Sequence, residues 1–193
     1  MKEKMKVTLK EAKTSLEYAL SILIILWIIR IVQSLFGLDF FYTLGVYPRE
    51  TFGLAGIITA PLIHGNFEHL IANTLPMFFL TFLIFFFYKK NVFLIYLLTW
   101  ITSGFLTWLI GRPSWHIGAS SVIYAMASFL IFGGIFSRNF KLIIASVIVV
   151  VLYSGLIWGI FPSNNGVSWE GHLSGAISGL IWAYIFRKQL QNI

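Results

Sequence analysis

The chain has 193 residues, of which 58% are hydrophobic and 11% are charged, whereas a water-soluble domain carries about a quarter charged residues. This composition excludes an ordinary soluble domain and predicts one membrane domain over residues 1–193. The net charge is +7, but the basic residues lie at the ends of apolar segments and indicate topology, so we expect no nucleic-acid partner. Cysteine is absent, which excludes disulfides, thiolate metal sites and cysteine nucleophiles.

Six apolar segments approach the length of about 20 residues that a membrane-spanning helix needs. They are Leu16–Phe36, His69–Tyr88, Val92–Ile110, Gly118–Phe136, Phe140–Phe161 and Gly171–Phe186. The first is too long for the core of a cleaved signal peptide and has no small-residue cleavage site after it, so we interpret it as a retained helix. The last is short and is expected to gain a turn at one end. The sequence therefore predicts an all-α bundle of six transmembrane helices.

The basic residues predict the orientation of this bundle. The N-terminal segment 1–15, the connections after the second and fourth helices, and the C-terminus hold most of the lysines and arginines, whereas Arg49 and Arg112 fall on the other side. Cytoplasmic segments carry the excess of basic residues, so we expect a multi-pass protein of the cell membrane with both termini cytoplasmic. Arg30 falls inside the first helix, and we expect it to face protein or an interface in a structural role, because a charge that faces lipid is costly.

The connection between the first two helices, residues 37–68, is the only long one in the predicted bundle. It is too apolar for a freely solvated loop, and Pro48, Gly53, Gly56 and Pro61 interrupt it. We therefore expect a partly helical segment that lies in the external membrane interface, with its aromatic rings at the level of the lipid headgroups.

A serine and a histidine begin two helices that run in the same direction. Ser120 belongs to the run GASS at residues 118–121, and His172 belongs to the run GHLSG at residues 171–175. The second, fourth and sixth helices all run from outside to inside, so His69, Ser120 and His172 are expected at one shallow depth near the external face. A serine becomes an effective nucleophile when an imidazole accepts its proton, which predicts a Ser120–His172 dyad.

Three other residues bear on how this histidine is oriented. The single aspartate, Asp39, lies outside the helices, and Glu170 is expected to point to solvent, so an acid-completed triad is not predicted. Tyr124 lies one turn below Ser120 on the same helix face. We expect its ring to stack on the imidazole of His172 and fix its orientation.

Small residues favour close contact between the fourth and sixth helices. Gly175 and Gly179 recur at a four-residue interval on the sixth helix, and Ser121 and Ser128 contribute to a small face on the fourth. Small residues at this spacing let helix backbones approach closely. We interpret these four residues as packing residues.

His69 and Asn73 are four residues apart and project from one face of the second helix. Their N–H groups are of the kind that stabilises a tetrahedral oxyanion, and a helix N-terminus favours the same charge. His64 precedes this helix and is expected to tie down the long connection by hydrogen bonds. For His64 and Glu68, a polar cluster that bonds loop carbonyls remains an alternative.

Two other catalytic classes fit this sequence poorly. The zinc-hydrolase motif H-E-x-x-H is absent, so a metal site among the four histidines is the weaker alternative and we expect no metal. An aspartyl intramembrane protease needs two aspartates, and the chain has one.

Together these residues resemble the rhomboid intramembrane serine proteases, over essentially the whole chain. The resemblance rests on GASS at 118–121 with Tyr124, on G-H-x-x-G-x-x-x-G at 171–179, on H-x4-H-x3-N at 64–73, and on the segments PR at 48–49 and TAPLIH at 59–64. It implies a six-helix fold and an endopeptidase, without a cofactor, that cleaves transmembrane segments of membrane-protein substrates near their outer end.

The resemblance also implies a role for each matching residue. Ser120 would be the nucleophile and His172 the general base, while His69 and Asn73 would line the oxyanion hole with the Ser120 backbone N–H. The supporting positions would be Tyr124, which stacks on the base, and Gly175, which allows close helix packing. Gly118 of the GASS motif and His64 of the H-x4-H-x3-N motif would also be supporting positions.

The family resemblance carries one implication about substrate access and one departure. Substrates would enter past the fifth helix and beneath a movable cap, here residues 162–170. The family usually has glycine after the nucleophile, where this chain has Ser121. We expect this hydroxymethyl group to narrow the site or lower activity without abolishing it.

Two hypotheses that assign the protein to other functional classes remain open. A rhomboid-like protein that binds or escorts membrane clients without cutting them generally lacks the serine or the histidine, and this chain has both. A small transporter or channel would place polar residues through the membrane depth, whereas the histidines here cluster on one side. The oligomeric state is not predicted.

Overall fold

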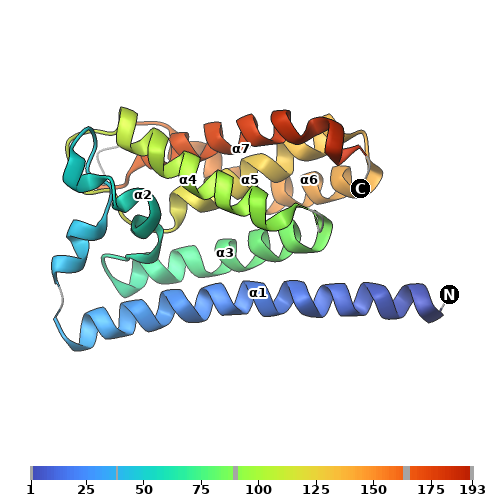
Figure 1. The fold of residues 1–193 in the computed structure, drawn as a ribbon, viewed down its shortest axis with the longest axis horizontal. Coiled ribbons are helices and arrows are strands. Elements are labelled where there is room, and N and C mark those ends of the chain that lie inside the picture. Colours follow the sequence, from blue (N-terminus) through green and yellow to red (C-terminus); the bar gives the residue numbers. More distant parts are fainter. Residues whose placement is uncertain (1, 38, 89–90, 163–165, 192–193) are drawn as a thin grey trace.

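The computed structural model describes residues 2–37, 39–88, 91–162 and 166–191, which are helical apart from short connections and one isolated β-bridge between Val46 and His116 (Figure 1). The long helices are α1 (Lys2–Leu35), α3 (Phe67–Phe87), α4 (Val92–Ile110), α5 (Ser120–Ser137), α6 (Phe140–Tyr153) and α7 (Trp169–Leu190). The all-helical prediction is confirmed, with helix bounds close to those expected except at α1 and at the end of α6, where the chain continues as a 3-10 helix.

Within the described part of the chain, five segments are long and apolar enough to cross a membrane by length and composition. They are Thr8–Leu35, Phe67–Phe87, Val92–Ile110, Ser120–Ser137 and Phe140–Ile160, the last of which joins α6 to the 3-10 helix η4 (Ser154–Ile160). The sixth expected span, Gly171–Phe186, lies inside the 22-residue helix α7, which is not one of these five. The described residues therefore contain five candidate membrane spans, which indicates a multi-pass membrane protein.

Helix α1 is longer than the sequence indicated. It begins at Lys2 and includes most of the basic segment 1–15, and Figure 1 shows it extending past the rest of the bundle at its N-terminal end. Its 34 residues rise about 51 Å at 1.5 Å each, against about 30 Å of hydrocarbon. The Arg30 guanidinium lies 4.9 Å from the ring centre of Phe67, so this charge faces protein as expected.

Helix α5 is the centre of the bundle. Of its 18-residue span, 67% is buried, against 17% of the span in α1, and its most extensive packing is against α7. A Cβ at Gly175 would overlap the carbonyl oxygen of Ser121, and one at Gly179 would overlap that of Ala125. The predicted small-residue contact is confirmed: these glycines let two backbones meet, which holds α7 on α5.

Residues 39–62 form a series of short helices that brace the chain before Ser120. They are η1 (Asp39–Leu44), η2 (Thr51–Gly53), α2 (Gly56–Thr59) and η3 (Ala60–Leu62). The Val46 and His116 backbones exchange hydrogen bonds of 2.9 and 2.8 Å, and the Gly118 N–H donates to the Ala60 carbonyl at 2.9 Å. The partly helical connection thus fixes the position of the loop that precedes α5.

Helices α3, α5 and α7 all begin at the left-hand end of the bundle in Figure 1, whereas α1 begins and α7 ends at the right-hand end. His69 lies in the first turn of α3, Ser120 is the first residue of α5, and His172 lies in the first turn of α7. The three residues that the sequence singled out therefore share one end of the bundle.

Candidate active site

Ser120 begins α5 directly after a turn that requires glycine. Gly118 has a φ of +105°, a conformation that glycine adopts without a steric penalty. A Cβ at this position would also lie 2.5 Å from Nε2 of His69. Gly118 therefore allows both the turn before Ser120 and the approach of the His69 ring to it.

The His172 side chain is 8% exposed and is held on one face and at one nitrogen. Its ring is stacked on Tyr124, with ring centres 4.2 Å apart and 7° between the planes. Its Nδ1 lies 2.9 Å from the carbonyl oxygen of Gly159. Because a carbonyl only accepts, Nδ1 carries the proton in this contact and Nε2 is left with the lone pair that a general base needs.

The stacking of Tyr124 on His172 is the contact expected from the position of Tyr124 four residues after Ser120. The contact to Gly159 was missed, because a backbone acceptor at the end of a distant helix leaves no side-chain signal in the sequence.

The first turn of α3 is fixed by its own polar groups. Asn66 caps the helix by accepting from the His69 backbone N–H at 2.7 Å, and the Asn73 side-chain amide donates to the His69 carbonyl at 2.9 Å. These bonds orient the two residues of the predicted oxyanion hole. One N–H of the Asn73 amide remains available, since the amide has two donors and this bond uses one.

His64 is fully buried and lies edge-to-face against His69, with ring centres 5.0 Å apart. Its Nε2 accepts from the backbone N–H of Ala119 at 3.5 Å, which links the first connection to the residue before Ser120. Burial, and then the neighbouring His69, lower the pKa of His64 from 6.5 to about 3. His64 is therefore a neutral acceptor at ordinary pH.

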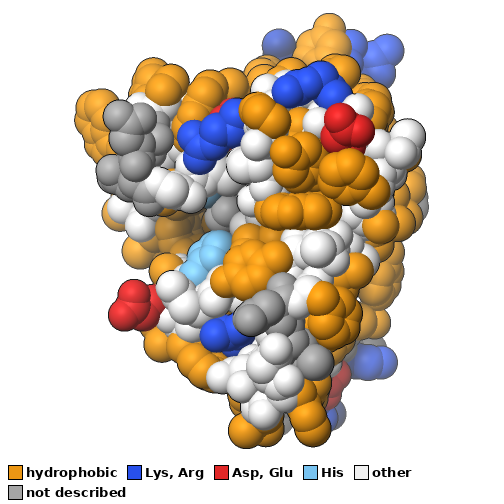
Figure 2. All heavy atoms as spheres, turned by 90° about the vertical axis from the view of Figure 1, so that its left-hand side faces the viewer, with side chains coloured by type: hydrophobic (Ala, Val, Ile, Leu, Met, Phe, Trp, Pro, Cys, Tyr) orange, Lys and Arg blue, Asp and Glu red, His pale blue; other side chains and the backbone are white. Residues whose placement is uncertain are grey.

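One cavity of about 670 Å³ is lined by Ser120, His172, Tyr124, His69 and Asn73 together. This volume lies in the range of about 300 to 1,000 Å³ that is usual for ligand sites. Its apolar wall includes Ala72, Pro76, Ile117, Ile123 and Leu156. Figure 2, which faces the end of the bundle where α3, α5 and α7 begin, shows a hollow with a histidine side chain at its edge. The candidate nucleophile, the candidate base and the candidate N–H donors thus line one cavity.

Ser121 does not line the large cavity. It lines a second pocket of about 20 Å³, the size of one water molecule, together with Ser120, Thr107, His116 and Ser168. The expected effect of Ser121 on activity stays a prediction. The Ser121 backbone carbonyl faces Gly175.

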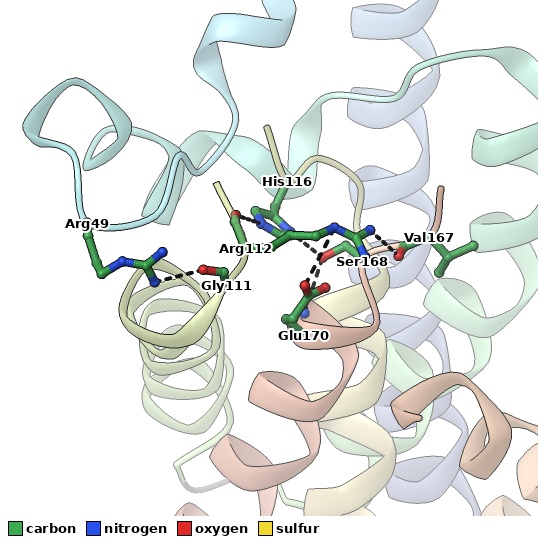
Figure 3. A network of polar contacts seen from close by, with 8 residues as sticks. Arg49, Gly111, Arg112, His116, Val167, Ser168 and Glu170 are labelled. Atoms are coloured by element: carbon green, nitrogen blue, oxygen red, sulfur yellow. Dashed lines mark hydrogen bonds and ion pairs between the residues drawn. The ribbon is translucent and has the colours of Figure 1, made fainter. Parts of the chain in front are cut away.

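Glu170 is only 3% exposed, so the expectation that it points to solvent is wrong. Its Oε1 lies 3.6 Å from Nε of Arg112, which comes from the loop after α4 and covers the carboxylate. Arg112 also donates from Nη2 to the Val167 carbonyl at 2.8 Å (Figure 3). Sequence reasoning missed this pair because its partners are far apart along the chain.

His116 completes this network. Its Nε2 donates to the Arg112 carbonyl at 3.0 Å, and its Nδ1 accepts from the Ser168 hydroxyl at 2.5 Å. Burial lowers the pKa of His116, an effect that the nearby Glu170 opposes. The predicted cap, residues 162–170, is therefore bonded at 167–170 to residues 112–116, while its residues 163–165 lie outside the described residues.

The Rhomboid domain family model matches residues 51–189, a range that contains every candidate site residue. An uncharacterized protein of Mycobacterium tuberculosis is 37% identical over 177 residues, which cover 86% of this chain and 72% of that protein. One of Mycobacterium leprae is 39% identical over 150 residues, covering 73% and 59%. A protein of Acanthamoeba polyphaga mimivirus that is named a rhomboid protein is 28% identical over 130 residues, covering 64% and 70%. By the extent of the family match and the identity to these relatives, the chain belongs to the rhomboid family.

Proposed function

We propose that this protein is a serine endopeptidase that cleaves transmembrane segments of membrane-protein substrates near their outer end. The observation that carries the proposal is the stacked pair of Tyr124 and His172 in one cavity with Ser120. A histidine that only packs does not need a stacked face, a bonded Nδ1 and a nucleophile in the same space. Membership of the rhomboid family supports the same chemistry.

In the proposed reaction, Nε2 of His172 accepts the hydroxyl proton of Ser120 as Oγ bonds to the carbonyl carbon of the scissile peptide. The carbonyl π electrons move onto oxygen. When they return, the C–N bond breaks, His172 gives the proton to the leaving amine, and an acyl-enzyme remains. Water then gives a proton to His172, attacks the ester carbon and displaces Ser120, which recovers its proton.

The oxyanion formed in each half of the reaction has N–H donors within the same cavity. We assign this role to the His69 ring, the Asn73 side-chain amide and the Ser120 backbone N–H. The Ser120 N–H lacks an intrahelical partner because it is at the start of the helix. The α5 N-terminus adds the positive end of its helix dipole. This assignment also gives Gly118 a reason to lack a side chain, since a Cβ would displace His69.

We further propose that residues 1–193 form a single domain, that α7 is the sixth span, that both termini are cytoplasmic and that the site faces outward. Support comes from the shared end of the bundle at which α1 begins and α7 ends (Figure 1). Basic residues gather there, with Lys10 and Lys13 on α1 and Arg187 and Lys188 on α7. The site lies at the opposite end, where the outer end of a substrate helix would meet it.

A fluorophosphonate probe tests the nucleophile directly, because it reacts with activated serines. We expect the purified protein to be labelled, and Ser120→Ala and His172→Ala to eliminate labelling. Ser121→Ala is the matched control, since it removes the neighbouring hydroxyl, and it should label like the wild type. Undiminished labelling of a folded Ser120→Ala variant would refute the assignment.

A further inference from the structure

The chain tightens after α6 into the 3-10 helix η4, and this helix brings a backbone carbonyl to the candidate base. The Gly159 carbonyl accepts the His172 Nδ1–H at 2.9 Å. A Cβ at Gly159 would lie 3.0 Å from that nitrogen and would overlap the Tyr124 hydroxyl. The two rings of the stacked pair therefore leave room at this point for a glycine.

No acid takes this place on the imidazole among the described residues whose contacts are known. Glu170, the acidic residue nearest to His172 in sequence, is paired with Arg112. A catalytic histidine is normally oriented by a third group, which fixes the tautomer and stabilises the imidazolium that forms. The Gly159 carbonyl has the correct polarity for this task, because it accepts from Nδ1 and leaves Nε2 free to take a proton.

We propose that the Gly159 carbonyl positions His172, and that η4 thereby links the cavity wall to the base. This inference rests on the proposed function and adds a positioning group to it. The carbonyl takes no proton at any step. It holds the Nδ1–H tautomer and its dipole favours the charged ring, so its effect is smaller than that of a carboxylate.

The link to the cavity follows from the geometry of η4. Leu156 lines the 670 Å³ cavity. Residues three apart in a 3-10 helix lie above one another, so Leu156 and Gly159 share one face of η4. None of the η4 residues is buried, and Trp158 is 76% exposed. A substrate that displaces Leu156 would therefore move η4 and, with it, the carbonyl that orients the base.

The kinetic test compares two alanine variants of the same 3-10 helix. A Cβ at Gly155 meets nothing within 4 Å, so Gly155→Ala controls for the change in helix propensity. We expect Gly159→Ala to lower kcat by about 10- to 100-fold, within the range of general-base effects, with KM within about 2-fold. Gly155→Ala should leave both within about 2-fold, as is usual for open sites. Equal effects of the two variants, or a change in KM alone, would overturn the proposal.

A spectroscopic test does not depend on protease activity, and its first measurement uses the wild-type protein alone. In ¹⁵N-histidine-labelled wild type at pH 8, the His172 ring, assigned by the signals lost in His172→Gln, should be protonated at Nδ1 and not at Nε2. An Nε2–H tautomer would overturn the inference even in an active protease. An Nδ1–H tautomer that becomes mixed in folded Gly159→Ala, in a protein that cuts no substrate, would uphold the inference while the proposed function failed.

Discussion

The His172 imidazole lies flat against the ring of Tyr124, with 4.2 Å between ring centres and 7° between the planes. Stacking uses the face of the imidazole and leaves its two nitrogens free in the ring plane. One nitrogen donates to the Gly159 carbonyl at 2.9 Å, and the other keeps the lone pair that the proposed general base needs. This arrangement lets a histidine be oriented firmly while keeping a lone pair for catalysis.

The stacked ring should matter more than its hydroxyl. An aromatic pair contributes about 0.5 to 1.5 kcal/mol beyond burial, so Tyr124→Ala should lower kcat by about 2- to 10-fold through lost orientation. Tyr124→Phe keeps the ring and should stay within about 2-fold of wild type. Steady-state cleavage of a membrane-spanning substrate measures kcat for both variants. Equal losses in the two variants would show that the hydroxyl, and not the stacking, supports the base.

The contact of α7 with α5 should be intolerant of one methyl group. Gly175→Ala would overlap the Ser121 carbonyl and move His172 away from Ser120. Overpacking costs about 1 to 3 kcal/mol, so we expect a lower thermal midpoint and loss of fluorophosphonate labelling. Leu180→Ala, at a position 37% exposed on the same helix, is the control and should label normally. A Gly175→Ala variant that matches this control would contradict the packing argument.

Acid should destabilise the fold through His64. The pKa of His64 is about 3 in the folded protein and 6.5 in the unfolded chain. Between pH 3 and pH 6.5, the unfolded chain therefore binds a proton that the folded chain does not. Stability contributed by His64 is present above pH 6.5 and is lost as the pH falls toward 3. Thermal midpoints measured from pH 7.5 to 4.5 should fall more steeply for the wild type than for His64→Asn. Parallel curves would mean that His64 does not remain neutral in the folded state.

Arg112 and Glu170 should be coupled, because removing one partner of a buried pair leaves the other charge uncompensated. Arg112→Met should therefore lower the thermal midpoint more than the double variant Arg112→Met/Glu170→Gln does. The carboxylate is nearly buried while the guanidinium is 40% exposed, so the penalty falls mainly on Glu170. If the effects of the two single substitutions on the thermal midpoint add up to the effect of the double substitution, the contact contributes no coupling energy.

The sequence predicted those features that depend on residues close together along a helix. Apolar runs located the long helices, and Tyr124 could be placed on the face of Ser120 because four residues complete about one turn. The interval between Gly175 and Gly179 predicted the contact of α7 with α5. In each case a local period of the sequence determines which side chains share a face.

Features that depend on the meeting of distant loops could not be predicted. Glu170 is buried where Arg112 reaches it from the loop after α4, and Ser121 lines the small pocket beside Thr107 and not the large cavity. The Gly159 carbonyl is a backbone group, whose position depends on the switch from α-helix to 3-10 helix after Tyr153. Charge and hydropathy patterns contain no information about these contacts.

Cleavage of a membrane-spanning substrate in vesicles tests the central claim most directly. Wild-type protein and a folded Ser120→Ala variant would be reconstituted with the same single-span substrate, and the products mapped by mass spectrometry. The dyad account predicts one cut near the outer end of the substrate helix by the wild type and none by Ser120→Ala. Undiminished cleavage by the folded Ser120→Ala variant would contradict it.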